Sequence, residues 1–429
     1  MDATKRLALK TYRHFMHDSL YRNSIFLMGN TIALGIFSFI FWLFAARIYS
    51  TNDVGIVSAV VAASTLLATL SFFGFDYALI KFIPRSNKAA LRTNTGLTFA
   101  ALLSIIASFL YLVIITLLIP KFSFLTSSWV WIASFTLLII ATTWNTLTNS
   151  IFIAHRIAQY ALLGTILLGI TRLPLVYFLK PDGEKGLLIS QLAAMVICVI
   201  VCFIFLRNKI GYKYKIQISK SELKHMSSYA FSTYLSNVSG GLPALILPTI
   251  ILKMLGAPAA AYFFIANQFA YLLYTIPSAT SQSLFAEGAW QNGKIEDLIK
   301  KSAKLMCAFV FSGTALMIAF GWILLSLFGK NYAASGYWML FLFSLTALPK
   351  IASYLFSTVL RIYGHVKEVV VIATIGTIIQ LGASYIGMRI TSNLVTLGIA
   401  ALLCEIFVSS SYVFLFYRYR KQGAFSPSA

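Results

Sequence analysis

Twelve uninterrupted apolar runs, each close to the length of a membrane span, constrain this chain more than any other feature of its sequence. A helix needs about 20 apolar residues to cross the roughly 30 Å of hydrocarbon in a bilayer. Inside hydrocarbon only helices and closed barrels satisfy their own backbone hydrogen bonds, and uninterrupted runs favour helices. The sequence therefore predicts an all-α, multi-pass membrane protein with about twelve transmembrane helices.

The composition agrees with a membrane protein. Hydrophobic residues make up 59% of the chain, charged residues only 11%, and mean hydropathy is +0.82. In a soluble protein about a quarter of the residues are charged. The apolar runs predict spans at 25–46, 54–74, 95–119, 129–152, 158–178, 186–206, 228–252, 259–284, 303–328, 336–360, 369–388 and 394–417.

The formal net charge of +22 would by itself suggest a nucleic-acid partner, but the placement of the cations indicates a membrane topology instead. With the N-terminus inside, 25 of the 34 cations fall on the cytoplasmic side and seven on the other. Lys and Arg collect in short cytoplasmic loops of membrane proteins. We therefore expect both termini in the cytoplasm, contacts with membrane lipids, and no nucleic-acid partner.

A hydrophobic hairpin at residues 24–84 returns about 206 residues later. In both copies a cation follows a glycine by twelve residues, Arg47 after Gly35 and Lys253 after Gly241. Because each half holds an even number of spans, the halves share one orientation, a symmetry found in secondary transporters. The predicted domains are a six-helix half at 1–206 that opens with a short interfacial helix, a basic cytoplasmic linker at 207–227, and a six-helix half at 228–429 that ends in a basic tail.

Both copies of the hairpin resemble a known family. The segments are SLYRNSIFLMGNTI, ARIYSTNDVGIVSAV and LSFFGFDYALIKFIP in the first half and KMLGAPAAAYFFIANQFAYLL in the second. They are similar to the polysaccharide exporters, which are oligosaccharide flippases of the multidrug/oligosaccharidyl-lipid/polysaccharide (MOP) exporter superfamily. Length, span count and linker position agree over nearly the whole chain, and Arg47 matches the end of the first helix in the related lipid II flippases.

This resemblance implies a fold and a function. The fold is MATE-like, a V-shaped pair of six-helix bundles with a cationic central cavity. The function is that of a flippase, not an enzyme, which translocates a polyprenyl-(pyro)phosphate-linked oligosaccharide across the cytoplasmic membrane by alternating access. The lipid-linked oligosaccharide is the implied substrate, surface polysaccharide biosynthesis the implied process, and glycan polymerase and export machinery the implied further partners.

Few charges lie at membrane depth, where each costs at least about 2.5–3.5 kcal/mol and by default faces the bundle interior or water. Arg172 and Lys350 lie within predicted spans, and Arg47 and Lys253 end matched spans. Together they predict a cationic substrate site, because a pyrophosphate needs positive partners and an arginine fork fits phosphate oxygens. The structural alternatives are interfacial anchoring for Arg47 and Lys253, and an ion pair with Glu405 or another acid for Lys350.

Asp76 and Glu405 are the acids placed near the bilayer, which makes them candidates for coupling transport to protons or another cation. Burial raises the pKa of a carboxyl group and a nearby cation lowers it, and a proton carrier needs that balance. Charge pairing is the alternative for both acids. For Asp76 the nearest partner in sequence is Lys81.

Glycine and proline interrupt the seventh predicted span at SGGLPALILP. Membrane transporters tolerate such interruptions where the backbone lines a cavity, and matched interruptions in two halves indicate a binding site. We therefore predict a hinge or cavity-lining role for Gly240, Gly241 and Pro243, with Gly35 as the matched residue of the first half. A packing kink is the alternative.

Catalytic and metal-binding signatures are absent from the sequence. There is no GxxxxGK[ST] loop, HExxH or GxSxG motif, and no acid cluster with metal-ligand spacing. We therefore predict no catalytic residue, no metal site and no cofactor, with an ion or proton gradient as the energy source. Alternatives to the flippase are a multidrug or cation antiporter of the same superfamily, a membrane-embedded glycan polymerase or ligase, and a noncatalytic scaffold.

Overall fold

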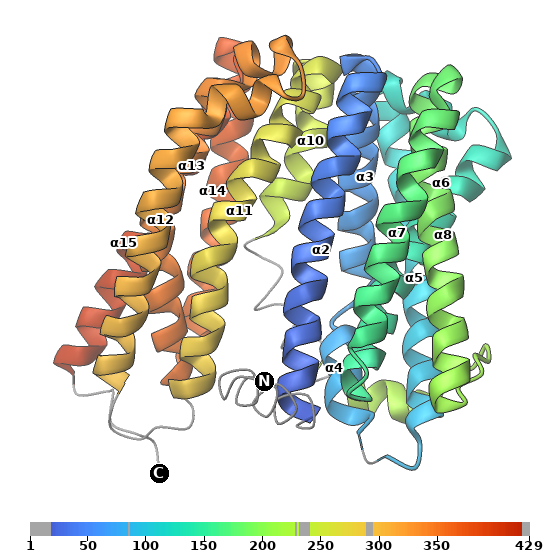
Figure 1. Cartoon of the computed structure of the whole chain (residues 1–429). Coiled ribbons are helices and arrows are strands. Elements are labelled where there is room, and N and C mark those ends of the chain that lie inside the picture. The colour runs from blue at the N-terminus through green and yellow to red at the C-terminus, as the bar shows by residue number, and fades with distance from the viewer. Residues whose placement is uncertain (1–18, 85, 228–229, 231–240, 289–294, 423–429) are drawn as a thin grey trace, which may run out of the picture. The chain divides into compact units, whose positions relative to one another are not determined.

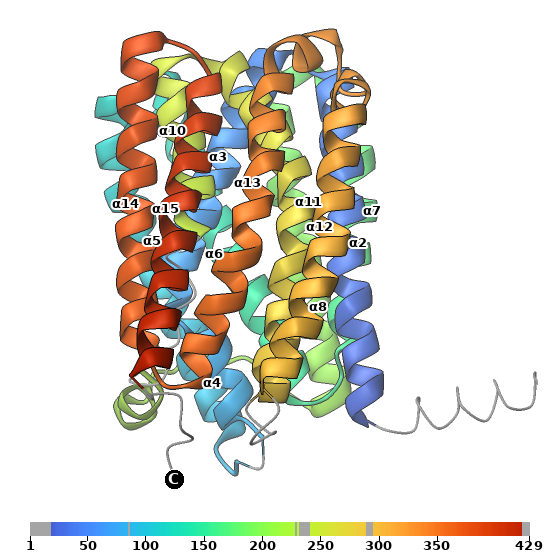
Figure 2. The same ribbon diagram turned by 90° about the vertical axis from the view of Figure 1, so that its left-hand side faces the viewer.

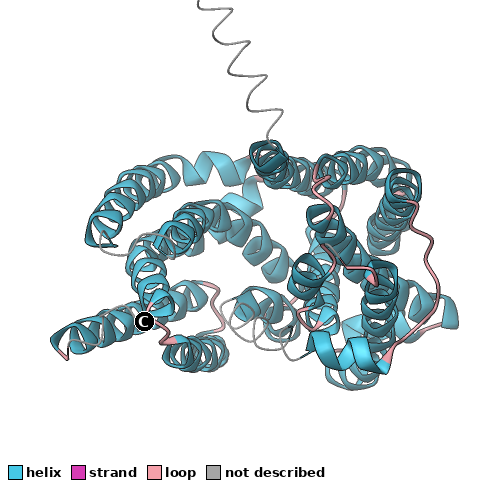
Figure 3. Ribbon diagram, turned by 90° about the horizontal axis from the view of Figure 1, so that it is seen from below, coloured by secondary structure: helices cyan, strands magenta, loops and turns pink. Residues whose placement is uncertain are grey.

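The computed structural model describes residues 19–84, 86–227, 230, 241–288 and 295–422, and all regular elements within them are helices (Figures 1 and 3). Two short 3₁₀ segments, η1 (Pro120–Thr126) and η2 (Lys180–Asp182), complete the chain path. The α-helices are α2 (Ser19–Ile48), α3 (Thr51–Phe72), α4 (Phe75–Phe82), α5 (Ala89–Leu118), α6 (Trp129–Ala154), α7 (Gln159–Phe178), α8 (Gly183–Ile210), α10 (Leu242–Met254), α11 (Ala257–Gly288), α12 (Ile295–Ser326), α13 (Lys330–Ile362), α14 (Val366–Thr391) and α15 (Val395–Lys421).

The predicted spans agree with these helices. Eleven described helices are long and apolar enough to cross a membrane, and each corresponds to one predicted span. The remaining span, 228–252, is represented by α10, a shorter apolar helix of 13 residues. The prediction of an all-α, multi-pass membrane fold is therefore confirmed. The interfacial helix expected in the first 22 residues falls almost entirely outside the described residues.

The sequence analysis predicted no helix at α4, whose residues follow the second predicted span. Phe73 and Gly74 have positive φ angles of 48° and 79°, so the chain turns sharply there and α4 begins at once. Phe75, Ala78 and Leu79 are buried, and this i, i+3, i+4 spacing is the signal of a helix. At eight residues α4 is too short to be counted as a span.

The chain divides into two compact units. Unit 1 comprises Met1–Tyr49 and Ala63–Tyr234, and unit 2 comprises Ser50–Ala62 and Leu235–Ala429. The first half of α3 therefore belongs with unit 2 although its sequence lies among the residues of unit 1. Gly55 shows why, because a Cβ atom at this position would lie 1.7 Å from the carbonyl oxygen of Ala257. Only glycine allows so close a backbone approach.

In unit 1, α7 packs between α2 and α8, while α6 packs on α4, α5 and α8. The buried core combines large and small apolar side chains, which include Leu97, Leu147, Phe152, Ala161 and Cys198. In unit 2, α13 contacts α11, α12 and α15, and α14 packs mainly on α15 (Figure 2). Apolar packing of this kind holds membrane helices together once their backbones are satisfied internally.

Candidate functional site

Arg172 lies two thirds of the way along α7, where this helix packs against α2 in unit 1. Its guanidinium carbon stands 4.9 Å from the centroid of the Phe41 ring on α2. Its Nε atom is buried and has no hydrogen-bond partner among the described residues. The residue as a whole keeps partial exposure.

Two hydrogen bonds reach α7 on either side of Arg172, one from α2 and one from Tyr49, the residue that follows α2. The Thr165 hydroxyl donates to the side-chain oxygen of Asn30 at 2.6 Å. The Tyr49 hydroxyl donates to the backbone carbonyl of Val176 at 2.9 Å. Polar contacts of this kind fix the register of membrane helices, so Arg172 is presented at a defined height on a fixed surface.

The charge of Arg172 is not neutralised within the described residues, where the side chain takes part in none of the five ion pairs. The contact with Phe41 contributes about 0.5–2 kcal/mol. Taking a charge out of water costs several kcal/mol, which exceeds that gain. The fold therefore holds this cation at a net cost, and the substrate role predicted for Arg172 stays a prediction.

Lys350 lies in unit 2 and is ion-paired. Its Nζ atom stands 2.6 Å from Glu405 Oε2, and the Ser353 hydroxyl donates to Glu405 Oε1 at 2.5 Å. Nζ also lies 5.0 Å from the centre of the Tyr274 ring. The cluster joins α11, α13 and α15, and both charged side chains are largely buried. The pairing considered as the alternative for Lys350 and Glu405 is therefore present, and it leaves the cluster close to neutral.

Arg47 and Lys253, the matched cations of the two hairpins, each lie in the last turn of their helix, α2 and α10. Both are exposed. A cation in the last turn of a helix is stabilised by the helix dipole, worth about 0.3–1 kcal/mol. The matched position in the two halves follows the sequence repeat, but exposure at a helix end fits an interfacial anchor as well as a substrate contact.

Asp76 lies in the first turn of α4, and its Oδ1 atom is buried without a hydrogen-bond partner. Within the described residues it forms no ion pair, so the local pair with Lys81 is not present. Burial raises the pKa of Asp76 to about 6, and backbone N–H groups of Tyr77 and Asp76 itself offset only part of this effect. A carboxyl group with this pKa changes its protonation near physiological pH.

The raised pKa of Asp76 predicts a pH-dependent stability. The group is protonated in both folded and unfolded states below pH 3.8, and stability is lost as pH rises through 6, where the folded carboxyl must ionise. Asp76→Asn should therefore stabilise the protein at pH 8 by about 2–3 kcal/mol and have little effect near pH 4. Thermal unfolding in detergent at the two pH values measures this. Asp182→Asn, at an exposed residue, is the control, and an equal effect of Asp76→Asn at both pH values would contradict the prediction.

The predicted hinge residues are only partly described. α2 continues without interruption through Gly35, and a Cβ atom there would meet nothing within 4 Å. Gly241 precedes α10 and Pro243 lies in its first turn, where proline is tolerated because its missing N–H would be unbonded anyway. Gly240 lies outside the described residues. The interruption expected at Gly35 is therefore absent, because a single glycine does not break a membrane helix.

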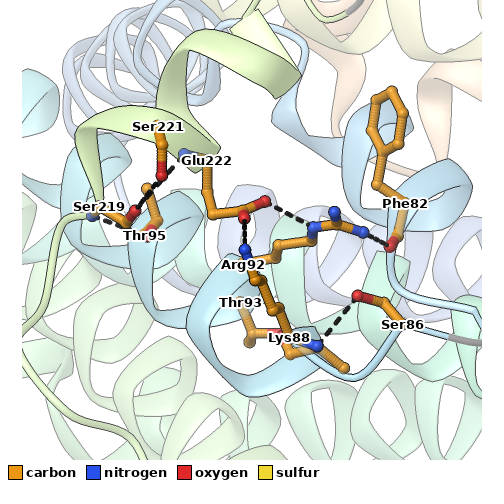
Figure 4. A network of polar contacts seen from close by, with 10 residues as sticks. Phe82, Ser86, Lys88, Arg92, Thr93, Thr95, Ser219, Ser221 and Glu222 are labelled. Carbon is orange, nitrogen blue, oxygen red and sulfur yellow. Dashed lines mark hydrogen bonds and ion pairs between the residues drawn. The ribbon is translucent and has the colours of Figure 1, made fainter.

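The sequence reading also missed a polar network at the end of unit 1 where the linker lies, which Figure 4 shows. Residues 211–227, here called the linker strap, follow α8 and lie against the start of α5. The Tyr212 hydroxyl donates to Asn94 Oδ1 at 2.6 Å, and the backbone N–H of Ser219 donates to the Thr95 hydroxyl at 3.1 Å. The strap is thus attached along its length instead of spanning freely.

Glu222 closes the strap onto α5. Its carboxylate accepts a hydrogen bond from Arg92 Nε at 2.8 Å and pairs with Lys88 at 3.2 Å (Figure 4). The bond from Arg92 and the charge of Lys88 hold the pKa of Glu222 below its ordinary value of 4.5. The sequence did contain a signal, because Glu222 is the single acid among the six cations of 207–224.

Glu222→Gln should loosen the strap. Removing a charge-assisted hydrogen bond costs about 1.5–3 kcal/mol, so amide hydrogen exchange within 211–222 should accelerate about tenfold or more. In the wild type the attachment is complete above pH 4.5 and is lost as pH falls through the depressed pKa, whereas the variant should show no such transition. Glu184→Gln is the control, and unchanged exchange in Glu222→Gln would show that the ion pairs do not hold the strap.

Comparisons with known proteins agree with this architecture. Residues 20–285 match the sequence pattern of a family described as "Polysaccharide biosynthesis protein", and no curated protein matches the chain. Among solved structures, a multidrug resistance MATE family transporter of the MOP superfamily in an inward-facing conformation is similar with a TM-score of 0.70 at 16% identity, covering 91% of this chain and 96% of that one.

Two further solved structures share the fold. The lipid II flippase MurJ in an inward closed conformation gives a TM-score of 0.73 at 13% identity, over 91% of this chain and 87% of MurJ. A MOP superfamily transporter from Pyrococcus furiosus, described as having a binding pocket of reverse polarity, gives 0.59 at 15% identity, over 95% and 96%. At identities this low the structural similarity establishes the fold alone, and this fold is that of MOP superfamily transporters. Because the matched sequence pattern covers more than half of its length, the chain belongs to the polysaccharide biosynthesis protein family.

Proposed function

We propose that the protein is a flippase that translocates a polyprenyl-(pyro)phosphate-linked oligosaccharide across the cytoplasmic membrane by alternating access, for surface polysaccharide biosynthesis. The observation that carries the proposal is Arg172, a cation held inside a membrane helix pair without a carboxylate partner among the described residues. It lies within the stretch that matches the polysaccharide family.

The chemistry of Arg172 suits a lipid-linked phosphate. A guanidinium offers a rigid fork of N–H donors that fits two phosphate oxygens, and its charge persists at any physiological pH. Stacking on Phe41 restricts its rotation and so lowers the entropy lost when a ligand binds. The substrate would supply the negative charge that the described fold does not.

The remaining predicted residues take subsidiary roles in this proposal. Arg47 and Lys253 would contact the pyrophosphate at the helix ends, and Gly241 would permit movement at the start of α10. Asp76 would accept and release the proton that couples transport to a gradient, so no cofactor is needed. We further propose that both termini face the cytoplasm, that the basic stretch 207–227 links two six-helix halves, and that glycan polymerase and export machinery act next.

A multidrug or cation antiporter is the second candidate, and Asp76 is the observation that favours it. A cationic drug needs a negative partner, and the Asp76 carboxylate has one oxygen without a hydrogen bond. Glu405, the other predicted acid, is already paired with Lys350. Arg172 also has no ion-pair partner among the described residues, and its position inside a long membrane helix favours an anionic substrate and hence the flippase.

The test is complementation of exporter-null hosts. Lipid-linked repeat units accumulate on the inner leaflet of such cells, so their exposure to an added glycan-cleaving enzyme in spheroplasts reports translocation directly. We expect this chain to restore surface glycan and outer-leaflet exposure in at least one host of a panel with different glycans. Growth in cationic drugs is measured in parallel, in a host that lacks its drug exporters.

The outcomes separate the candidates. Exposure of repeat units without drug resistance supports the flippase. Drug resistance without glycan exposure in any host would overturn it in favour of the antiporter. Longer glycan chains on substrate that has already been exposed by another flippase would indicate a polymerase or ligase.

A further inference from the structure

Unit 2 carries a groove between α14 and α15 that the proposed function does not use. Its volume is about 660 Å³, within the roughly 300–1,000 Å³ of ordinary ligand sites. The α14 residues lining it recur at i, i+1, i+4 and i+5, and the α15 residues at i, i+3, i+4, i+7 and i+8, so each set forms one helix face. The lining residues are Lys367, Glu368, Val371, Ile372, Phe407, Ser410, Ser411, Phe414 and Leu415.

The groove has a rigid floor. Behind it the Tyr412 hydroxyl of α15 donates to the Val369 carbonyl of α14 at 3.0 Å, and both residues are buried. Further along, α14 and α15 touch so closely that a Cβ atom at Gly376 would lie 2.4 Å from a methyl carbon of Val408. The two helices are therefore in close contact at two levels beside the groove.

The walls of the groove are apolar and exposed. Val371, Phe407 and Phe414 have exposed fractions of 54%, 47% and 66%. In a membrane protein such a surface meets lipid chains and not water. The adjacent Ser410 is exposed and has no hydrogen-bond partner among the described residues, so it offers a hydroxyl donor between these apolar side chains.

A cation stands at one end of the groove. Lys367 is exposed in the first turn of α14 and forms no ion pair within the described part of the chain. The neighbouring Glu368 is engaged elsewhere, since it lies 3.7 Å from His365 Nδ1 and accepts a hydrogen bond from the Tyr419 hydroxyl at 3.1 Å. A lysine at the end of a helix can pair with a lipid phosphate while the apolar groove beside it holds the acyl chain of the same lipid.

We propose that this groove binds an anionic phospholipid, with one acyl chain along Val371, Phe407 and Phe414, the phosphate at Lys367 and a polar oxygen near the glycerol at Ser410. Basic pockets between membrane helices recognise anionic headgroups in this way. Because Glu368 is held by His365 and Tyr419, Lys367 is the charged lining residue left to meet a lipid phosphate, which favours an anionic lipid. The site is separate from Arg172, which belongs to unit 1.

The test uses the purified full-length protein in detergent, with equal amounts of phosphatidylglycerol and phosphatidylcholine, and counts retained lipids by native mass spectrometry. The wild type should retain one phosphatidylglycerol in preference to phosphatidylcholine. Lys367→Gln should reduce this preference about fivefold. Val371→Trp should fill the groove and remove the retained lipid of either kind.

Matched controls exclude general effects of charge and bulk. Lys300→Gln removes an exposed lysine from α12, and Ile378→Trp adds bulk to an exposed position of α14 outside the groove. Both should retain lipid as the wild type does, and all variants should unfold at the wild-type temperature. An unchanged preference in Lys367→Gln, lipid retention by Val371→Trp, or displacement of phosphatidylglycerol by a tenfold lower amount of polyprenyl phosphate would overturn the proposal.

Discussion

Replacing Arg172 with glutamine should reduce glycan export by about 100-fold while the protein stays folded in the membrane. Two charge-assisted hydrogen bonds to a phosphate contribute about 3 kcal/mol or more, which corresponds to two orders of magnitude. Arg172→Lys keeps the charge without the planar fork, so export should be intermediate. The amount of surface glycan in an exporter-null host, at matched membrane levels of protein, measures export by both variants. Arg389→Gln, at an exposed residue, is the control.

A purely structural role for Arg172 predicts a loss of stability instead of a specific loss of export. If its contact with Phe41 mainly holds α2 against α7, then Arg172→Gln should lower the unfolding temperature and export should fall only with the amount of folded protein. If the charge is kept for substrate, removing it should leave stability unchanged or raise it, because an unpaired buried charge is costly. Full export by Arg172→Gln would remove Arg172 from the proposed site.

Glu405→Gln should destabilise the protein by about 3–5 kcal/mol, because it leaves the Lys350 ammonium largely buried without its partner. The double variant Lys350→Met with Glu405→Leu should recover most of this loss, since apolar side chains of similar size can replace a buried ion pair. Thermal unfolding in detergent measures both. Glu296→Gln breaks the exposed pair with Arg420 and should cost less than about 1 kcal/mol.

The same variants separate packing from transport at the Lys350 cluster. A double variant that is stable and exports glycan would show that the ion pair only joins α13 and α15. A double variant that is stable but inactive would show that the two charges take part in the transport cycle. A Glu405→Gln protein as stable as the wild type would mean that Lys350 loses its charge or reaches water, contrary to the buried ion pair described above.

The fold could be predicted from the sequence because a bilayer imposes a simple requirement on every helix. Each span must be about twenty apolar residues long, so the spans stand out without any knowledge of packing. The elements that were missed, α4 and the linker strap, lie outside the apolar runs. They are stabilised by buried faces and long-range hydrogen bonds, which composition does not show.

The candidate site was predictable only as a set of charges. Arg172 and Lys350 stand out because a cation inside an apolar run is rare. Their environments differ for a reason that the sequence does not contain, since Glu405 is 55 residues from Lys350 and reaches it only because α13 packs on α15. Similarly, the sequence does not show that Arg172 lacks a carboxylate partner among the described residues. This is known only once α2 is placed against α7.

The packing of Gly55 against Ala257 has a consequence for biosynthesis. The 202 residues that separate them take about 10–40 s to synthesise at about 5–20 residues per second. During that time the start of α3 is in the growing chain without the helix end that will cover it. Truncation after the first half would leave residues 50–62 permanently uncovered. Expression of the two halves as separate chains should therefore yield a first half that depends on an insertase or chaperone until the second half arrives.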